Sequence, residues 1–434
     1  MNFVRNLLSA FNLGHVSFVG SSALVQLFPL FSAPIIARLY TPAEFGIYSV
    51  FFALSAILAG VSALALTNAT LLEDEDVSGA HATLLAMTVT VIFCSLLLVL
   101  IIGTPRTTMA AFFGEAVVTY LPWLPLSAVI SGIFTCLYTW AIRTKQYHLL
   151  ARNRLVLGAS TAGLQIGIGL TDPGAIGFIL ANLCGYGLAV TLLILPFLRD
   201  LRRLKPSFGL HSALAQFRKH RALPLWTVPA NLVNSVCSFL PDLIIGRLFG
   251  VALLGQFSLA SRMVSFPLSF IATSAQDIFR QQAAQEFIEH GHCRQTFNRF
   301  LLLMGLAAAG LLIPIILVVP YVFPIIFGSQ WNQSGVLIQA VGLLLVVRFI
   351  SSPLSYVWII RGHHKLNFLW QSGLMSISLT TLLAPPLLNA SVSLYQTLWV
   401  YSVGVGAWYV FCIFVSRHFA YIRLSDTLRS AGPG

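Results

Sequence analysis

The chain has 434 residues, of which 57% are hydrophobic and 9% are charged, and its formal net charge is +12 at pH 7. A soluble domain carries about 25% charged residues, so this composition excludes a water-soluble globular protein. The six cysteines show no C-x-x-C spacing, which argues against a disulfide framework and a zinc site. We predict no metal and no cofactor.

Runs without charged residues predict the membrane-spanning segments in chain order. Five runs are each long enough for one crossing of about 20 residues, namely 6–37, 45–72, 77–105, 116–142 and 173–198. Two longer runs predict two spans each, because polar or proline-containing breaks divide 300–347 at 327–335 and 366–416 at 384–391. Residues 155–171, 222–241 and 248–276 complete about twelve spans. Backbone groups in lipid must be paired within the segment, so we predict an all-α polytopic membrane protein.

The basic residues predict the orientation of these spans. With the N-terminus in the cytoplasm, 20 of the 25 Lys and Arg residues fall on inside loops. Only Arg38, Arg106 and Arg247 fall outside, and Arg262 and Arg348 lie within spans. The positive-inside rule therefore places both termini in the cytoplasm. The positive charge is spread over many short loops and is explained by topology and anionic lipid, so we predict no nucleic-acid partner. The acidic run at 73–76 is interpreted as a solvated inside loop.

Two short phrases occur twice. "IIARLYTPAEFGIYSV" at 35–50 aligns with "IIGRLFGVALLGQFSL" at 244–259 without a gap, and "WAIR" at 140–143 aligns with "WIIR" at 358–361. Six crossings separate the copies of each phrase, so both copies run in the same direction. We therefore predict two parallel six-helix halves. The halves are residues 1–198 and 222–434, joined by a cytoplasmic linker at 199–221.

Several stretches resemble one transporter family. "RLYTPAEFGIYSV" resembles the first hairpin of the polysaccharide-export and O-antigen flippase branch of the multidrug/oligosaccharidyl-lipid/polysaccharide superfamily. Residues 242–269 resemble the seventh and eighth helices of that branch, with Phe257 in place of the usual Tyr, and residues 348–366 resemble its tenth helix. The family's R-Y-E-like triplet after the second helix is replaced by Ala65-Leu66-Thr67, so no substrate contact is carried over to that place.

The resemblance implies a function in the bacterial inner membrane. Such proteins pass a lipid-diphosphate-linked oligosaccharide from the cytoplasmic to the outer leaflet, for polysaccharide, O-antigen or exopolysaccharide biosynthesis. The expected partners are that substrate, membrane lipids and proteins of polysaccharide assembly. Sugar hydroxyls left unpaired in hydrocarbon each cost several kcal/mol, so a hydrated cleft with fixed cations would lower the barrier to crossing.

The two arginines within spans are the first candidates for substrate binding. An arginine in mid-span costs about 2.5–3.5 kcal/mol on insertion scales and usually faces a cavity or a partner. The planar fork of Arg262 or Arg348 suits the oxygens of a diphosphate. The alternative for each is a structural pair or a charge that reaches the membrane surface.

Four further charges are candidates. Asp242 lies near the outer end of the seventh span, where it could pair with Arg38 or Arg247 or bind a coupling cation. Arg143 and Arg361 form the repeated pair at inner helix ends. Topology and stabilisation of helix C-termini explain the pair without a substrate, and contact with the diphosphate at the cytoplasmic mouth is the second hypothesis.

Other functions remain as alternatives. A cation-coupled antiporter of drugs or small molecules would share the architecture, but the first two predicted spans contain no carboxylate. A membrane enzyme would need paired carboxylates or a metal site, whereas Glu44, Glu115 and Asp172 fall on different outside loops. We therefore predict a transporter and no enzyme. The chain also lacks a G-x-x-x-x-G-K-[ST] nucleotide-binding signature, so transport would depend on a gradient or on consumption of the product.

Overall fold

The computed structural model describes residues 28, 30–171, 174–204, 209–221, 223–360, 364–389 and 391–422. Within these ranges every regular element is a helix. In this part of the chain eight helices are long and apolar enough to cross a membrane, and the number is nine if one pair of helices bent by 54° is counted as a single span. The apolar helix Leu30–Leu39 and the long helices α9 (Tyr147–Gly169) and α19 (His364–Leu388) lie at three further predicted spans. The predicted all-α polytopic class is confirmed.

Packing divides the chain into two compact units, Met1–Gly255 and Gln256–Gly434. The helix α12 (Val228–Leu248) packs against α3 (Pro42–Ser62) and so belongs to the first unit. The division by packing therefore falls further along the chain than the division predicted from the repeats. The repeat-based boundary at 199–221 stays a prediction.

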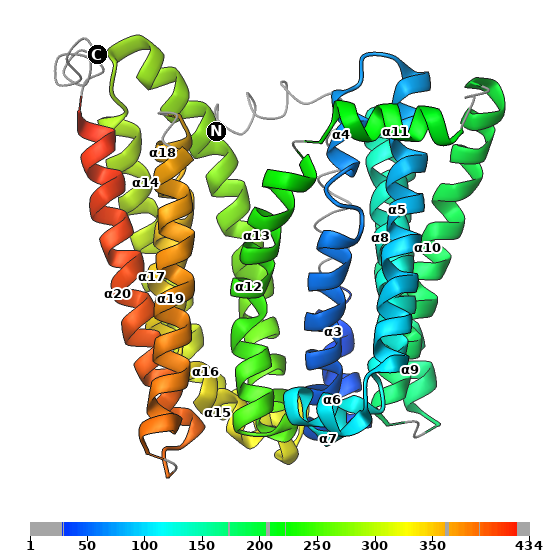
Figure 1. The fold of residues 1–434 in the computed structure, drawn as a ribbon. Coiled ribbons are helices and arrows are strands. Elements are labelled where there is room, and N and C mark those ends of the chain that lie inside the picture. Colours follow the sequence, from blue (N-terminus) through cyan, green and yellow to red (C-terminus); the bar gives the residue numbers. More distant parts are fainter. Residues whose placement is uncertain are drawn as a thin grey trace. The chain divides into compact units, whose positions relative to one another are not determined.

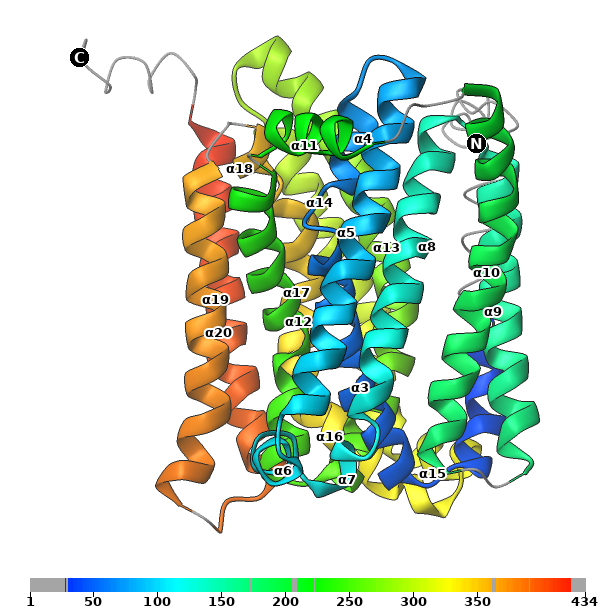
Figure 2. The same cartoon turned by 45° about the vertical axis from the view of Figure 1, so that its right-hand side comes forward.

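The described part of the first unit is a bundle of long helices with short helices at both ends (Figures 1 and 2). In both views α6 and α7 lie across one end of the bundle, and α4 and α11 lie at the other end. Besides Leu30–Leu39, α3, α9 and α12, the elements are α4 (Thr67–Leu72), α5 (Asp76–Gly103), α6 (Arg106–Phe113), α7 (Glu115–Val118), η1 (Leu121–Trp123), α8 (Leu124–Arg143), α10 (Ala175–Leu204), α11 (Leu210–Lys219), η2 (Leu223–Thr227) and the start of α13 (Val251–His290).

The sequence at the start of α3 explains why the helix begins there. The side chain of Thr41 accepts a hydrogen bond from the backbone of Glu44 at 3.3 Å, and the Glu44 carboxylate accepts one from the Thr41 backbone at 2.7 Å. Pro42 occupies the first turn, where no backbone donor is needed. This reciprocal capping box gives Glu44 a structural role.

The repeated phrase has a direct geometric consequence within the first unit. Gly46 in α3 and Gly255 in α13 are equivalent positions of the two copies, and so are Pro42 and Val251. A Cβ on Gly46 would collide with the backbone carbonyl of Val251, and a Cβ on Gly255 would collide with that of Pro42. Each such Cβ would also lie 3.0 Å from the backbone nitrogen of the other glycine. The two copies therefore meet in a nearly symmetric backbone contact that only glycine allows.

The described part of the second unit contains the rest of α13 followed by seven numbered helices and two short helical turns. These are α14 (Arg294–Ala307), η3 (Ala308–Leu312), α15 (Ile313–Phe327), η4 (Ser329–Trp331), α16 (Asn332–Ala340), α17 (Gly342–Leu354), α18 (Val357–Ile360), α19 and α20 (Leu394–Tyr421). The turn η3 is π-helical, and it joins α14 to α15 as a single apolar span.

Both predicted breaks in the long apolar runs are confirmed. The first follows α15 at Gly328, whose φ of +104° suits glycine, and the next span then bends by 54° between Ser329–Ala340 and Gly342–Leu354. Ser334 on the near side of that bend donates to the buried Gln256 at 2.6 Å. The second break lies between the end of α19 and the capping box of Ser393 that starts α20.

Candidate functional site

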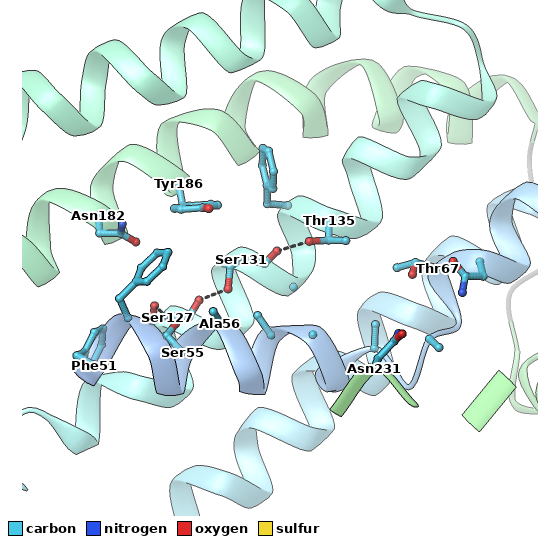
Figure 3. Close-up of a pocket in the computed structure, with 18 of the residues that line it drawn as sticks. Phe51, Ser55, Ala56, Thr67, Ser127, Ser131, Thr135, Asn182, Tyr186 and Asn231 are labelled. Carbon is cyan, nitrogen blue, oxygen red and sulfur yellow. Dashed lines mark hydrogen bonds between the residues drawn. The ribbon is translucent and has the colours of Figure 1, made fainter. Parts of the chain in front are cut away.

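The first unit encloses a polar cavity of about 410 Å³ within its membrane-spanning helices. Its walls come mainly from α3, α8 and α10, with one side chain from α12 (Figure 3). Five aromatic rings line the cavity, those of Tyr48, Phe51, Phe52, Phe134 and Tyr186. The other polar residues among the described lining are uncharged, namely Ser55, Thr67, Asn68, Ser127, Ser131, Thr135, Asn182 and Asn231. We call this space the polar cavity.

The hydroxyl groups in the polar cavity are held in fixed directions. Ser131 donates to the carbonyl of Ser127 at 2.7 Å, and Thr135 donates to the carbonyl of Ser131 at 2.9 Å (Figure 3). The hydroxyls of Ser55 and Ser127 lie 2.6 Å apart. A hydroxyl that has used its hydrogen keeps lone pairs that can accept. The cavity wall therefore presents acceptors for ligand hydroxyl groups.

Aromatic and amide groups continue the wall on α10. The Asn182 side chain donates to the Tyr48 hydroxyl at 3.1 Å, which leaves a second amide hydrogen and the amide oxygen. The ring of Tyr48 stacks on Phe178 with a centroid distance of 4.8 Å. The polar cavity thus combines fixed rings with groups that can both donate and accept.

An unwound segment between α3 and α4 forms one end of the polar cavity. Leu64 and Ala65 have φ values of +49° and +57°, and this left-handed conformation costs about 1–2 kcal/mol per residue without glycine. Ala63, Ala65 and Thr67 line the cavity. Broken helices beside a cavity are typical of secondary transporters. The Ala65-Leu66-Thr67 triplet, which departs from the family pattern, thus lies at the cavity itself.

The second unit has a smaller pocket of about 200 Å³ between α13 and α17. Arg348 lines it from α17, and its other polar lining residues are Ser265, Ser269, Thr273 and Ser352. Arg262, which is half-buried, lies three residues before Ser265 on α13, and residues with this spacing share a helix face. The structure thus places the cationic side chain of Arg348 among hydroxyl groups. Substrate binding by either arginine stays a prediction.

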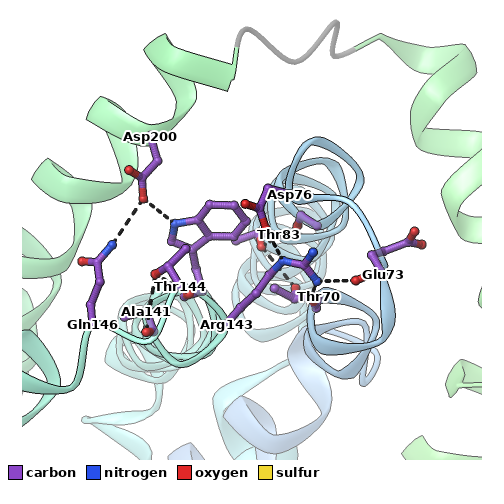
Figure 4. Close-up of polar contacts among 11 residues, drawn as sticks. Thr70, Glu73, Asp76, Thr83, Ala141, Arg143, Thr144, Gln146 and Asp200 are labelled. Atoms are coloured by element: carbon purple, nitrogen blue, oxygen red, sulfur yellow. Dashed lines mark hydrogen bonds and ion pairs between the residues drawn. The ribbon is translucent and has the colours of Figure 1, made fainter. Parts of the chain in front are cut away.

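The repeated Arg143 holds the turn between α4 and α5 (Figure 4). Its guanidinium donates to the carbonyls of Thr70 and Glu73 at 2.7 and 2.6 Å and to the carboxylate of Asp76 at 3.3 Å. The side chain is 10% exposed. These contacts support the structural explanation, and substrate binding by Arg143 stays a prediction. Its partner in the repeat, Arg361, lies outside the described residues.

The remaining predicted charges lie in the first unit. Arg247 donates twice to the Ala111 carbonyl, at 3.1 and 2.9 Å, and so ties α12 to α6. Asp242 is half-buried on α12, Arg38 is exposed, and both interact with other residues. The pairing of Asp242 with either arginine and its role in cation coupling stay predictions.

The interpretation of residues 73–76 as a solvated loop is wrong for Glu73. Its side chain is 3% exposed, and its carboxylate contacts Lys219 at 2.7 Å and His220 at 2.6 Å. Burial alone would raise the pKa of Glu73, but the hydrogen bonds from Lys219 and His220 outweigh burial and hold the pKa below its ordinary value. The end of the linker helix α11 is thereby attached to the α4–α5 turn.

Sequence reasoning did not identify the polar cavity. A signal was present, because Ser127, Ser131 and Thr135 recur every four residues in a charge-free span and so lie on one helix face. Hydroxyl residues are common in membrane helices as local hydrogen-bond donors, and the spacing alone does not separate a cavity wall from a packed interface.

Comparison with known proteins gives the family context. A family model described as "Polysaccharide biosynthesis protein" matches residues 35–335. The teichuronic acid biosynthesis protein TuaB of Bacillus subtilis is 23% identical over 235 residues, which are 52% of this chain and 45% of TuaB. The lipopolysaccharide biosynthesis protein WzxC of Escherichia coli is 19% identical over 160 residues, which are 37% of this chain and 32% of WzxC. The matched regions span less than half of each relative.

Solved structures share the fold of this chain. One described as the lipid II flippase MurJ in an inward closed conformation matches with a TM-score of 0.75 and 12% identity, over 95% of this chain and 89% of that one. An inward-facing multidrug resistance MATE family transporter matches with a TM-score of 0.65 and 13% identity, over 94% and 96% of the two chains. The predicted transporter fold is thereby confirmed. The sequence identities are too low to infer a substrate from these structures.

Proposed function

Because the chain belongs to the polysaccharide biosynthesis protein family, we propose that it is a flippase for a lipid-diphosphate-linked oligosaccharide. It moves this lipid from the cytoplasmic to the outer leaflet of the bacterial inner membrane, and both of its termini lie in the cytoplasm. It supplies polysaccharide, O-antigen or exopolysaccharide synthesis and performs no chemistry of its own. Proteins of polysaccharide assembly are its expected partners.

The polar cavity is the observation that carries this proposal. A sugar hydroxyl moved from water into hydrocarbon without a partner costs about 4–8 kcal/mol, so several of them forbid unassisted crossing. The cavity supplies acceptors on Ser127, Ser131 and Thr135, and it supplies donors and acceptors on Asn182. Its aromatic rings offer flat apolar surfaces against the sugar ring carbons. A volume of about 410 Å³ lies within the range of ligand sites.

The described residues that line the polar cavity carry no charge, and this favours a neutral glycan over an organic cation as the occupant. A cation drawn into this space would need a carboxylate to replace its lost hydration. Neutral hydroxyls need only hydrogen bonds, which the lining provides. The lining thus favours glycan transport over the antiporter alternative.

The diphosphate needs cations, and Arg348 and Arg262 are the proposed ones. Arg348 stands among the hydroxyls of its pocket, and a guanidinium can hold two phosphate oxygens at once. Arg143 and Arg361 are proposed only as secondary contacts at the cytoplasmic mouth. Asp242 is the proposed coupling residue, so Asp242→Asn should abolish any dependence of transport on an ion gradient.

A matched pair of substitutions on α8 tests the role of the polar cavity. Thr135 and Thr139 each donate to the carbonyl four residues earlier, at 2.9 and 2.8 Å, but only Thr135 lines the cavity. Glycan export is measured by complementation of a flippase-deficient strain, with protein levels checked in the membrane fraction. Thr135→Val should reduce export severalfold and Thr139→Val should leave it unchanged. Equal export by both variants would remove the cavity from the transport path, and a gain in drug resistance without glycan export would favour the antiporter.

A further inference from the structure

The first unit carries a second cavity of about 330 Å³ whose lining is almost entirely apolar. It lies between α3, α5, α6 and the start of α8, and among the described residues its only polar lining comes from Thr104 and Thr108. The hydroxyl of Thr104 is already used, because it donates to the Leu100 carbonyl at 2.7 Å. An apolar space of this kind does not hold ordered water. We call it the apolar groove.

The apolar groove has a buried floor and an exposed rim. Ile57, Leu121 and Leu124 form the floor and are buried, whereas Leu100 and Phe112 on the rim are 64% and 72% exposed. The face of α5 beside the rim is also apolar and exposed, with Val99 at 68%. In a membrane-spanning segment such a face contacts lipid. The groove therefore opens toward the hydrocarbon of the bilayer.

One helix separates the apolar groove from the polar cavity. On α3, Phe51 and Ser55 line the polar cavity, whereas Leu54 and Leu58 line the groove. The two linings lie on different faces of α3, because Phe52 and Ala56 on the cavity side stand two residues, or about 200° of helical turn, before Leu54 and Leu58 on the groove side. A helix with its side chains is about 10–12 Å across. The first unit thus holds a polar and an apolar compartment within one helix diameter of each other.

Positive charge lies beside the groove on α6. Arg106 begins this helix, and its contact with Glu115 is 3.9 Å long with both side chains largely exposed, which makes a weak pair. Arg247 reaches α6 from α12 and donates two hydrogen bonds to the Ala111 carbonyl. An apolar groove with arginines at its edge matches an amphiphile that has a hydrocarbon tail and an anionic group.

We propose that the apolar groove holds the isoprenoid tail of the lipid-linked oligosaccharide while its headgroup uses the polar cavity. This inference rests on the proposed function. The tail gains little free energy by moving from the bilayer into the groove, because lipid is as apolar as leucine. The groove therefore acts by close packing around the hydrocarbon tail. A phospholipid could enter the groove, but it has no glycan for the polar compartment on the other face of α3. The juxtaposition therefore selects the glycan lipid.

The test uses the purified full chain in phospholipid nanodiscs and a polyprenyl-diphosphate-linked disaccharide that carries a photoreactive diazirine in its polyprenyl chain. Peptide mapping should locate the label on groove residues such as Leu58, Ile101 and Met109. The same glycan lipid without the diazirine should suppress the label, and additional phospholipid should not.

Leu58→Trp should fill the groove and lower the labelling about tenfold, because the indole ring takes the space in which the hydrocarbon tail makes its dispersion contacts. The matched control is Leu126→Trp, because Leu126 is 44% exposed and does not line the groove. Labelling of Leu126→Trp should equal that of the unaltered chain. The unaltered chain alone also tests the idea, so misfolding of a variant would not leave it undecided.

Two results would overturn the inference. One is a label spread evenly over exposed positions such as Leu96 and Ile102, and the other is equal displacement by phospholipid, which would make the groove a general lipid site. A failure of the proposed function would be seen in a different experiment, the complementation assay, as unaltered glycan export by variants of the polar cavity. Because labelling reads tail binding and complementation reads export, the two failures are distinguishable.

Discussion

Replacing Gly46 by alanine should show why the repeated phrase keeps its glycine. The added Cβ would collide with the backbone carbonyl of Val251 and would lie 2.6 Å from its carbonyl carbon and 3.0 Å from the Gly255 nitrogen. Backbone atoms cannot rotate away as a side chain can, so the two helices must separate. Overpacking of this kind costs about 1–3 kcal/mol, and a backbone collision belongs at the upper end.

The same helix offers an internal control. Gly60 also lies in α3, and a Cβ there would meet only the Ser235 hydroxyl at 3.5 Å, an ordinary contact. Alanine improves helix propensity by about 1 kcal/mol at either position. Gly60→Ala should therefore stabilise the protein by about 1 kcal/mol, and Gly46→Ala should destabilise it by about 2 kcal/mol. The difference is about 3 kcal/mol.

The measurement is the free energy of unfolding in a single detergent, followed by tryptophan fluorescence. Gly255→Ala should resemble Gly46→Ala, because its Cβ would collide with the Pro42 carbonyl. The double variant should cost less than the sum of both, since one separation of the helices relieves both collisions. Equal stability of Gly46→Ala and Gly60→Ala would refute the backbone contact.

Three further predictions concern charged residues. Glu73→Gln should lower the free energy of unfolding by about 1–3 kcal/mol. Because the native pKa of Glu73 is depressed, this stability is present above the ordinary pKa of about 4.3 and is lost as pH falls through the native pKa. Urea unfolding measured at a series of pH values from 7 to 3 should therefore show a loss of stability at acid pH that the variant lacks. Arg143→Lys should also cost about 1–3 kcal/mol, since an ammonium cannot reproduce the fork that reaches two carbonyls and a carboxylate; an unchanged unfolding midpoint would contradict the structural role. Arg348→Ala and Arg262→Ala should each impair glycan export at normal protein levels, and full export by both would remove them from the substrate site.

Local features of the fold could be predicted from the sequence because they depend on neighbouring residues. Hydropathy located the long helices, and the polar or proline-rich stretches at 327–335 and 384–391 located the breaks. The capping box at Thr41 likewise depends only on Thr, Pro and Glu at a fixed spacing. The candidate site was harder to predict from the sequence. Arg348 was recognised as a charge in an apolar span, but the hydroxyls around it come from two helices far apart in the chain.

By itself, the sequence determined that this chain is a helical membrane protein with an internal repeat, since the length of the hydrophobic runs and the recurrence of the short phrases are properties of the linear sequence. Only the tertiary structure decided which polar groups share a space. Ser55 and Ser127 are 72 residues apart and their hydroxyls lie 2.6 Å from each other, and Lys219 reaches Glu73 across 146 residues. In an apolar helix nearly every face is hydrophobic, so periodicity does not reveal which side turns toward lipid, toward another helix or toward a cavity. That choice is made by packing between distant segments, and it is the packing that turned α3 into a wall with a polar cavity on one face and an apolar groove on the other.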